Sequence, residues 1–489
     1  MNVDSIKSNF KFELVARIIA AVTSGATIVF LARSLEPENY GILFLSISIF
    51  TIVGFFAQLG ISKSASRYIS DYLVEDESQI PHIIKLSTVF LALLVGCSVI
   101  GVVLFRYRAA AVMGEPELAF FLLIGTLYIA GFAIKRHTRI ILQGFQSIQF
   151  SAFIHSVEGV SRLLFVVLFV TVGFGAIGAL LGYILSFGLA AIIGTIIIIS
   201  FYRKYDRSTT PDSDLAKRIF QYSIPIAVTR SASKLDKEVD TLLVGFFLSP
   251  LAVSYYAISK QIIRFTEIPA SALGFTISPI YGENQSLNEL EESARVFETT
   301  LVNTLLLYLP ACAGLIIISK PTVTYIFGPE YTEAATVLQV MAVYMVLQAI
   351  GYITNGGLDF LGKASVRAKI RGSTAILNVV LNIIFIPTFG VIGAAFVTVF
   401  TFSLYTIAVL FIMYSEFPVD LVRLAANSSR ALIITILMTV PVYVSSLYIT
   451  GVVTLLGTVA IGAGSWLILS ASFGMIGINM DGSILDIVK

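Results

Sequence analysis

The chain has 489 residues, of which 57% are hydrophobic and only 13% are charged, and its mean hydropathy is +0.90. A soluble domain does not tolerate so much apolar surface, so the composition excludes a soluble enzyme and indicates a polytopic membrane protein. The net charge of +2 says little here, because in a membrane protein the location of Lys and Arg matters more than their total.

Apolar runs long enough to cross a bilayer recur along the whole chain. A helix needs about 20 mostly apolar residues to span the hydrocarbon core, and such continuous runs exclude a β-barrel, whose strands are short and alternating. We therefore predict an all-α protein with fourteen transmembrane helices, at residues 12–33, 41–61, 86–105, 118–134, 150–172, 178–200, 219–247, 251–281, 298–318, 334–355, 372–387, 391–414, 430–449 and 453–472.

The basic residues between these spans predict the orientation. Most of the 32 Lys and Arg residues fall in segments on one side, among them Lys135, whereas the other side has only Arg106, Arg108 and Lys320. Cytoplasmic segments are the ones enriched in Lys and Arg, so we expect a plasma-membrane protein with both termini in the cytoplasm. The segments 62–85 and 201–218 mix charges with Pro and Ser and are expected to be solvated connectors.

Two short motifs recur at an offset of about 215 residues, which is the repeat test that transporter architecture invites. The hexapeptide FGAIGA at 174–179 returns as FGVIGA at 389–394, and LEP at 35–37 returns as LSP at 248–250. The repeat predicts two six-span bundles related by a pseudo-twofold axis along the membrane normal, with a substrate site at their interface near the midplane.

This repeat also predicts the domain organisation. The boundaries are 1–200 for an N-lobe, 201–218 for a cytoplasmic linker, 219–414 for a C-lobe, and 415–489 for the two last spans and the tail.

Ionisable residues interrupt the predicted spans, although a charge at the centre of a membrane helix costs about 2.5–3.5 kcal/mol on insertion scales. Such residues rarely face lipid and are functional by default. The basic ones are Arg17, Arg33, Arg162, Arg230, Lys234, Lys237, Lys260 and Arg264. The acidic ones are Glu158, Asp236, Glu238, Asp240 and Glu267.

The segment 219–281 carries most of these charges, at helical spacing. Residues that share a helical face there are Arg230, Lys234, Lys237 and Thr241, and then Lys260, Arg264 and Glu267. We interpret the two stripes as the lining of a water-filled, cationic cavity. Two other interpretations stay open. The charges could form i, i+3 pairs, Lys237 with Asp240 and Arg264 with Glu267, or the first stripe could lie in a loop.

The candidate site joins these stripes to charges on the first and fifth spans. Predicted substrate-binding residues of the cationic cavity are Arg17, Arg162, Arg230, Lys234, Lys237, Lys260 and Arg264. Predicted ion-coupling or charge-balancing residues are Glu158, Asp236, Asp240 and Glu267. Glu158 precedes Arg162 by four residues, so the two could line the cavity or form a structural ion pair. For Arg17, a snorkelling anchor is an equal alternative, and for Arg33 it is the favoured one.

No catalytic or metal site is expected from the sequence. His82, His137 and His155 are scattered without cysteine partners at ligand spacing, and the two cysteines, Cys97 and Cys312, are expected to be packing residues. A nucleotide-binding phosphate loop is missing. We expect no cofactor apart from a coupling ion, Na⁺ or H⁺, and no nucleic acid partner.

Four motifs resemble one known family over almost the full length. They are LEPENYG at 35–41, YSIP at 222–225, Asp240 with Val244-Gly245 behind it, and FGVIGA at 389–394. With the layout of six, six and two spans, the chain is similar to the polysaccharide-exporter branch of the multidrug/oligosaccharidyl-lipid/polysaccharide flippase superfamily.

The resemblance implies a flippase that moves lipid-linked oligosaccharide from the cytoplasmic to the outer leaflet by alternating access, without ATP, for surface polysaccharide or glycoprotein assembly. It implies as partners a glycan on a polyprenyl phosphate or pyrophosphate carrier, the membrane lipids and glycan-assembly enzymes. It also implies a lipid groove near the last two spans.

Two other functions remain in view. An ion-coupled multidrug or organic-cation antiporter of the same superfamily would stop at twelve spans and place acidic residues in its cavity. A membrane glycan polymerase or ligase would need a large outer loop, and the predicted outer loops are too short.

Overall fold

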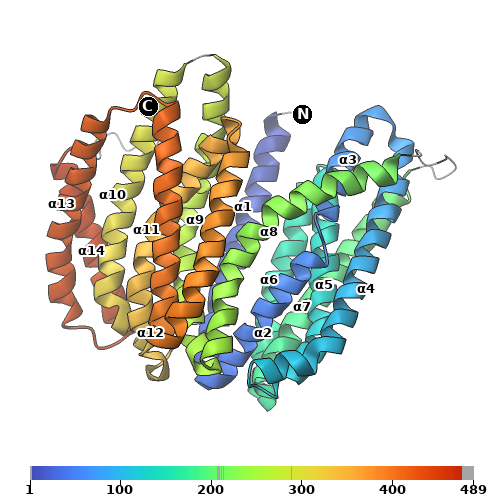
Figure 1. Ribbon diagram of the computed structural model, residues 1–489, viewed down its shortest axis with the longest axis horizontal. Helices are drawn as coiled ribbons and strands as arrows, with labels where there is room; N and C mark the ends of the chain where they lie inside the picture. The colour runs from blue at the N-terminus through green and yellow to red at the C-terminus, as the bar shows by residue number, and fades with distance from the viewer. Residues whose placement is uncertain (1–2, 206–209, 211, 213, 288, 476–489) are drawn as a thin grey trace. The chain divides into compact units, whose positions relative to one another are not determined.

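The computed structural model of the protein describes residues 3–205, 210, 212, 214–287 and 289–475, with side chains at 3–10, 226, 228–236 and 285–286 outside the description. All regular structure in the described residues is helical (Figure 1). The helices are α1 (Val3–Ser34), α2 (Pro37–Phe56), α3 (Ile61–Glu75), η1 (Glu77–Gln79), α4 (Ile80–Val112), α5 (Leu118–Gly144), α6 (Ile148–Phe169), η2 (Val170–Phe174), α7 (Gly175–Tyr202), α8 (Leu215–Phe247), α9 (Pro250–Ser286), α10 (Leu290–Thr322), η3 (Val323–Phe327), η4 (Pro329–Tyr331), α11 (Ala334–Phe360), α12 (Ala364–Glu416), α13 (Leu421–Ser446) and α14 (Val452–Ser472).

Each predicted span coincides largely with one of these helices, although the predicted span 41–61 runs past the end of α2, and the all-α membrane class is confirmed. Within the described residues, 10 helical stretches are long and apolar enough to cross a membrane, and two of them, Ile148–Tyr202 and Ala364–Glu416, each hold two predicted spans. Helices α8 and α9 are long enough as well, but they are not among the 10. Both helices carry several of the charged residues on which the cavity hypothesis rests.

The repeated hexapeptide marks the same backbone break in both halves of the chain. Gly175 ends the π-helical turn η2 with φ 55° and ψ −139°, and Gly390 interrupts α12 with φ 64° and ψ −150°. Only glycine populates this region readily. The sequence match between 174–179 and 389–394 is therefore a match of conformation too.

The second repeated motif marks two helix starts. Pro37 is the first residue of α2 and Pro250 the first of α9, a position where proline needs no hydrogen-bond partner and its fixed φ suits the helix. The two motifs also meet, because a Cβ added to Gly41 would lie 1.8 Å from the carbonyl oxygen of Pro250. Only glycine fits at position 41 of the LEPENYG motif.

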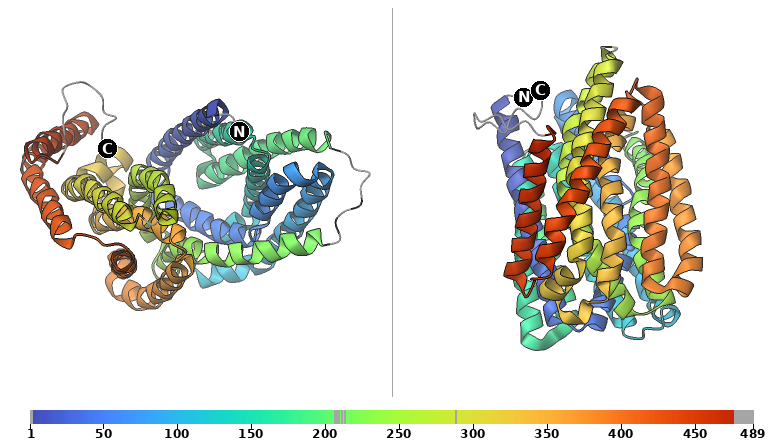
Figure 2. Two further views of the ribbon diagram at one scale, coloured as in Figure 1. Left: turned by 90° about the horizontal axis from the view of Figure 1, so that it is seen from above. Right: turned by 90° about the vertical axis from the view of Figure 1, so that its left-hand side faces the viewer.

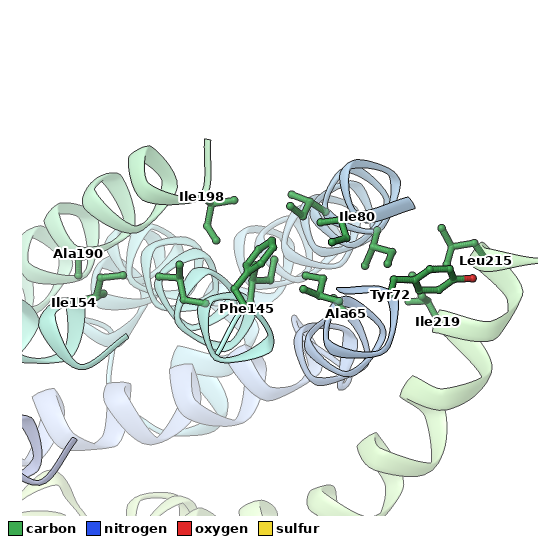
Figure 3. Close-up of a cluster of buried hydrophobic side chains, with 14 residues drawn as sticks. Ala65, Tyr72, Ile80, Phe145, Ile154, Ala190, Ile198, Leu215 and Ile219 are labelled. Carbon is green, nitrogen blue, oxygen red and sulfur yellow. The ribbon is translucent and has the colours of Figure 1, made fainter. Parts of the chain in front are cut away.

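The prediction that 62–85 is a solvated connector is wrong. Most of this segment forms α3, an amphipathic helix whose buried face includes Ala65, Ile69 and Tyr72. That face packs in a hydrophobic cluster with residues of α4, α5, α6, α7 and α8, among them Ile80 and Phe145 (Figure 3). The charges of α3 lie on the opposite face, so its mean composition hides its buried stripe.

The segment 201–218 is also held by specific contacts. The Asp212 backbone N–H donates to Gln79 Oε1 at 3.0 Å, and Gln79 Nε2 donates to the Thr210 carbonyl oxygen at 3.2 Å. Asp212 also accepts from the Tyr72 hydroxyl at 3.2 Å and pairs with Arg218. These contacts tie the segment to α3 and η1.

The chain divides into two compact units. Unit 1 comprises Met1–Ala257 and Asn382–Val391, and unit 2 comprises Ile258–Leu381 and Ile392–Lys489. Helices α9 and α12 thus contribute to both. The predicted lobe boundaries, the pseudo-twofold axis and the cytoplasmic location of the termini stay predictions.

In unit 2, a tyrosine side chain enters the backbone hydrogen-bond pattern of α9 next to a proline. Pro269 lies inside α9, and the Tyr308 hydroxyl of α10 enters the adjoining turn, donating to the Thr266 carbonyl oxygen at 2.6 Å and accepting from the Ala270 N–H at 3.0 Å. A side chain inserted between a carbonyl and the N–H four residues later bends a helix. Tyr308 thereby satisfies two backbone groups that the apolar surroundings would otherwise leave unpaired.

Candidate functional site

The densest group of buried charges in the described part of unit 1 centres on Glu158 of α6. One oxygen, Oε2, lies 2.9 Å from Lys135 Nζ and 3.3 Å from His155 Nδ1, and the other, Oε1, lies 3.3 Å from an Arg162 guanidinium nitrogen. The side chains of Glu158 and Lys135 are 6% and 7% exposed. We call these four residues the Glu158 cluster. Glu158 and Arg162 do form an ion pair, which was one of the two alternatives for these residues; their role in lining a cavity stays a prediction.

Aromatic rings enclose the two cations of this cluster. Lys135 Nζ lies 4.6 Å from the ring centroid of Phe187 and 5.0 Å from that of Phe132, and the Arg162 guanidinium lies 5.5 Å from the ring centroid of Tyr183. Ring faces attract cations most strongly where water is excluded. The aromatic rings of α5 and α7 therefore hold the ammonium and guanidinium groups in place.

Close helix packing brings the cluster together. A Cβ added to Gly159 would lie 2.7 Å from Thr23 Oγ1 and 3.4 Å from Ala20 Cα, so glycine lets α6 approach α1. Small residues serve this purpose in membrane helices because they allow backbones to come close. The charged residue next to Gly159 is thereby fixed inside the bundle.

The sequence analysis missed Lys135 as a site residue because it placed Lys135 in a segment between two spans; the side of the membrane assigned to that segment stays a prediction. The predicted span 118–134 stops one residue before Lys135, whereas α5 continues to Gly144 and Lys135 lies on its buried face. His137 likewise lies inside α5, 3.0 Å from the Ser62 hydroxyl of α3. The apolar run Ile140–Leu142 after the charges is the signal that could have extended the span.

Within this cluster the members differ in access to the surface. Arg162 and His155 have 13% and 26% of their side chains exposed, and no described residue accepts a hydrogen bond from Arg162 Nε. Lys135 and Arg162 place two cations around one carboxylate. The buried Lys135–Glu158 pair is suited to a structural role, and of the two cations Arg162 has the larger exposed fraction.

A second buried group in unit 1 surrounds the carboxylates of α8. Asp240 is 3% exposed and accepts hydrogen bonds from the Tyr256 hydroxyl at 3.0 Å and from Asn382 Nδ2 at 2.9 Å. Glu238 is 8% exposed and accepts from the Ser48 hydroxyl at 3.1 Å. Neutral donors of this kind satisfy an ionised carboxylate inside a membrane protein. Tyr256 and Asn382 were not anticipated from the sequence.

The basic stripe of α8 lies on a continuous helix. The backbone is helical from Leu215 to Phe247, so the alternative that these charges occupy a loop is wrong. Lys237 is half-buried. The side chains of Arg230, Lys234 and Asp236 lie outside the described residues, and their assigned roles stay predictions.

The remaining candidates are distributed over both units. Arg17 of α1, in unit 1, is exposed and donates from Nε to Glu13 at 3.1 Å. On α9, in unit 2, Lys260 is half-buried and Arg264 exposed. Glu267 accepts from the Tyr352 hydroxyl of α11 at 2.7 Å. The structure therefore supports two buried polar groups within unit 1, and the joint cavity stays a prediction.

Unit 2 also holds an apolar groove of about 360 Å³. Its walls come from α10, α13 and α14, which lie side by side (Figures 1 and 2), with further residues from α9 and α11. We call it the α10–α13–α14 groove. The lining is almost entirely apolar and includes Leu307, Gly314, Met438, Val442, Ala463 and Trp466.

The apolar helices define a multi-pass helical membrane protein with charges buried between its helices, and its family and relatives make it a transporter rather than an enzyme. Residues 6–280 match the family described as "Polysaccharide biosynthesis protein", and residues 225–384 match the MatE family. The chain belongs to the polysaccharide biosynthesis protein family, within the multidrug/oligosaccharidyl-lipid/polysaccharide exporter superfamily.

Named relatives agree with this assignment. The chain is 24% identical over 408 residues to the "Probable low-salt glycan biosynthesis flippase Agl15" of Haloferax volcanii, covering 83% of this chain and 82% of the relative. It is 23% identical over 355 residues to the "Succinoglycan biosynthesis transport protein ExoT" of Rhizobium meliloti, covering 70% and 66%.

Solved structures share the fold. The lipid II flippase MurJ in an inward closed conformation superimposes with a TM-score of 0.78 at 17% identity, covering 95% of this chain and 99% of that one. An inward-facing multidrug resistance MATE family transporter gives 0.70 at 16% identity, covering 84% and 96%.

Proposed function

We propose that this protein is a flippase that moves a lipid-linked oligosaccharide from the cytoplasmic to the outer leaflet of the plasma membrane, for assembly of a surface polysaccharide or glycoprotein. The observation that carries the proposal is the α10–α13–α14 groove. A soluble drug or free sugar needs no such surface, whereas a polyprenyl chain attached to the cargo does.

The basic residues suit the other end of this substrate. A polyprenyl phosphate or pyrophosphate is anionic and binds best to guanidinium and ammonium groups. The Arg162 side chain is 13% exposed in unit 1, and Arg264 is exposed on α9. These residues, with Arg17, Lys237 and Lys260 and the undescribed side chains Arg230 and Lys234, would bind the phosphate in an alternating-access cycle.

The family members named above support the same substrate class, since one is called a glycan biosynthesis flippase and the other a succinoglycan biosynthesis transport protein. Coverage adds a second point against the multidrug antiporter. The MATE transporter covers 84% of this chain, whereas the lipid II flippase covers 95%. This difference in coverage is about as long as two helices, as expected for a protein with two spans more than a twelve-span antiporter.

The coupling ion is part of the proposal as well. Asp240 and Glu267 each accept a hydrogen bond from a tyrosine hydroxyl, so either could balance neighbouring positive charge or take up Na⁺ or H⁺. If an ion is coupled, imposing or collapsing its gradient changes the rate of glycan translocation in sealed vesicles, and an unchanged rate leaves these carboxylates a structural role.

The groove is tested by filling it. Ala463 lines the groove and is exposed, so Ala463→Phe should fit without disturbing the core and should obstruct a prenyl chain. Ala460→Phe is the matched control, because Ala460 is also exposed on α14 but does not line the groove. Both variants are introduced into a strain that lacks the native protein, and surface glycan and lipid-linked glycan are measured.

We expect Ala460→Phe to restore surface glycan. We expect Ala463→Phe to fail to restore it and to leave lipid-linked glycan accumulated in the cytoplasmic leaflet. Equal restoration by both variants, at equal protein abundance, would remove the groove from the transport route. Restored drug resistance without any change in glycan would favour the multidrug antiporter instead.

A further inference from the structure

Unit 2 holds a polar pocket that the transport proposal does not use. It has a volume of about 300 Å³ and lies at the N-terminal ends of α10 and α13, beside the residues that follow α14. Its polar lining residues are Arg295, Glu298, Thr299, Asn303, Arg423, Asn427 and Arg430. We call it the α10–α13 pocket.

The pocket presents basic groups from two helices. Arg423, Asn427 and Arg430 recur at i, i+4 and i+7, so they share one face of α13, and Arg295 faces the pocket from α10. This arrangement places three guanidinium groups and two side-chain amides around one small volume. Guanidinium groups bind phosphate oxygens in bidentate fashion.

Most carboxylates near the pocket have other contacts. Glu298, a lining residue that is 8% exposed, accepts the Asp420 backbone N–H at 2.7 Å. Asp420 itself caps α13 by accepting from the N–H groups of Val422 and Arg423. The capping carboxylate and Glu298 therefore stabilise the helix start.

The arginines differ in how far they are already neutralised. Arg295 forms exposed ion pairs with Glu292 at 3.5 Å and Glu291 at 4.0 Å, which are weak because water screens them. Arg423 and Arg430 have no carboxylate of the described residues within 4.0 Å of their guanidinium groups, and Arg430 contacts only the Asn427 amide oxygen at 3.5 Å. Their positive charge remains available to a ligand.

The pocket has an apolar floor on which the acyl chains of a lipid could pack. Val302, Leu424 and Met475 supply apolar lining, and the apolar cluster of Leu306, Ala431 and Ile434 lies one turn further along the same helices. Helices α10, α13 and α14 are each long and apolar enough to cross a membrane. The N-terminal ends of α10 and α13, which carry Arg295, Arg423 and Arg430, therefore lie at the level of lipid headgroups. Basic pockets between membrane helices at that level bind anionic headgroups.

We propose that the α10–α13 pocket binds the headgroup of an anionic bilayer phospholipid, with its phosphate on Arg423 and Arg430, its polar headgroup near Asn303 and Asn427, and its acyl chains along the apolar floor. Such a lipid clamps α13 to α10. Because α13 and α14 also form two walls of the α10–α13–α14 groove, anionic lipid content would set the stability of that groove without being the transported substrate.

The test uses the purified full-length protein in a neutral detergent. Its thermal unfolding midpoint is followed during titration with dihexanoyl phosphatidylglycerol, and dihexanoyl phosphatidylcholine serves as the uncharged-headgroup comparison. The variants are Arg423→Ala/Arg430→Ala and Lys369→Ala, the latter removing an exposed basic residue of unit 2 that does not line the pocket. Arg423→Lys/Arg430→Lys keeps the charge and loses the bidentate geometry.

We expect the phosphatidylglycerol to raise the midpoint of the native protein and of Lys369→Ala. We expect at least about a tenfold higher lipid concentration to be needed after Arg423→Ala/Arg430→Ala, and an intermediate requirement after the lysine replacements. Unchanged midpoints without lipid verify that the exposed arginines are not needed for folding.

Three results would overturn the assignment. Equal effects of the two phospholipids would show that the headgroup charge is irrelevant, and a full effect of inorganic phosphate alone would reduce the pocket to a general anion site. An arginine-dependent response to farnesyl phosphate, with none to phosphatidylglycerol, would assign the pocket to the phosphate of a polyprenyl carrier.

Discussion

At the scale of single residues, Glu158 determines how charge is distributed in unit 1. It contacts Lys135, His155 and Arg162 within 3.3 Å. Removing one partner of a buried pair costs about 3–5 kcal/mol, because the other charge is left uncompensated. The consequence for each partner depends on how many opposite charges it keeps.

This asymmetry gives a prediction about stability. Glu158→Leu leaves Lys135 and Arg162 without their carboxylate, so it should lower the thermal unfolding midpoint strongly. Lys135→Met should lower it less, because His155 and Arg162 still contact Glu158 and the methionine preserves the packing against Phe132 and Phe187. The double variant Lys135→Met/Glu158→Leu should recover part of the loss, since no unpaired lysine remains.

The midpoints of the three purified variants in detergent check this prediction. A double variant that is less stable than Glu158→Leu alone would show that the two residues do not act as a pair.

Asp212, outside the membrane helices, gives a prediction about pH. Hydrogen bonds from the Asp214 N–H and the Tyr72 hydroxyl, and the Arg218 charge, hold the pKa of Asp212 below its ordinary value of 3.8. A lowered folded-state pKa stabilises the protein above the unfolded pKa, and this stabilisation is lost as pH falls through the folded pKa. The contact between 201–218 and α3 should therefore persist at neutral pH and fail only in acid.

The comparison to make is between the native protein and Asp212→Asn. Their difference in unfolding midpoint should stay constant from pH 8 to about pH 5 and shrink below about pH 4. Glu75→Gln, which removes an exposed carboxylate of α3, is the control. A difference that grows in acid would mean that Asp212 is not stabilised in its charged form.

At the scale of the helices, the sequence was most informative where a backbone break is needed. The FGAIGA and FGVIGA repeat predicted two equivalent positions, and the structure places Gly175 and Gly390 there with nearly equal φ and ψ. Helix ends were harder to predict where charges face inward. Lys135 marks a false end of α5 because a buried partner on another helix neutralises it, and hydropathy carries no record of that partner.

The amphipathic helix α3 was missed for a related reason. Its buried residues, such as Ala65 and Ile69, alternate with Lys63, Arg67 and Asp71, so its average composition resembles a loop. Its helical period was present in the sequence, but a search for membrane spans of about 20 apolar residues does not detect it.

The glycine break can be tested within one helix. Gly390→Ala should destabilise the protein by about 1–3 kcal/mol, because alanine rarely adopts a positive φ. Gly372→Ala, in the same α12, meets no atom within 4 Å and has ordinary helical geometry, so it should be neutral or stabilise by up to about 1 kcal/mol. Unfolding midpoints that rank the two variants in the opposite order would contradict the assigned break.

At the scale of the whole molecule, the class was predictable and the site was only partly so. Composition and span lengths were enough for an all-α membrane transporter, and the four motifs pointed to the family that residues 6–280 match. The donors that surround Asp240 could not be predicted, because Tyr256 lies on the next helix and Asn382 comes from distant sequence. An uncharged Asn or Tyr in an apolar helix gives no signal of its own.

The central claim is that the protein translocates a lipid-linked oligosaccharide. The most direct test reconstitutes the purified chain into sealed liposomes that carry a fluorescent lipid-linked oligosaccharide in both leaflets, and then adds an impermeant quencher outside. We predict that protein-containing vesicles lose nearly all fluorescence, while vesicles with Ala463→Phe or without protein retain the inner-leaflet share of about half. Retention of that inner share with the active native protein, together with uptake of an organic cation by the same vesicles, would contradict the flippase assignment.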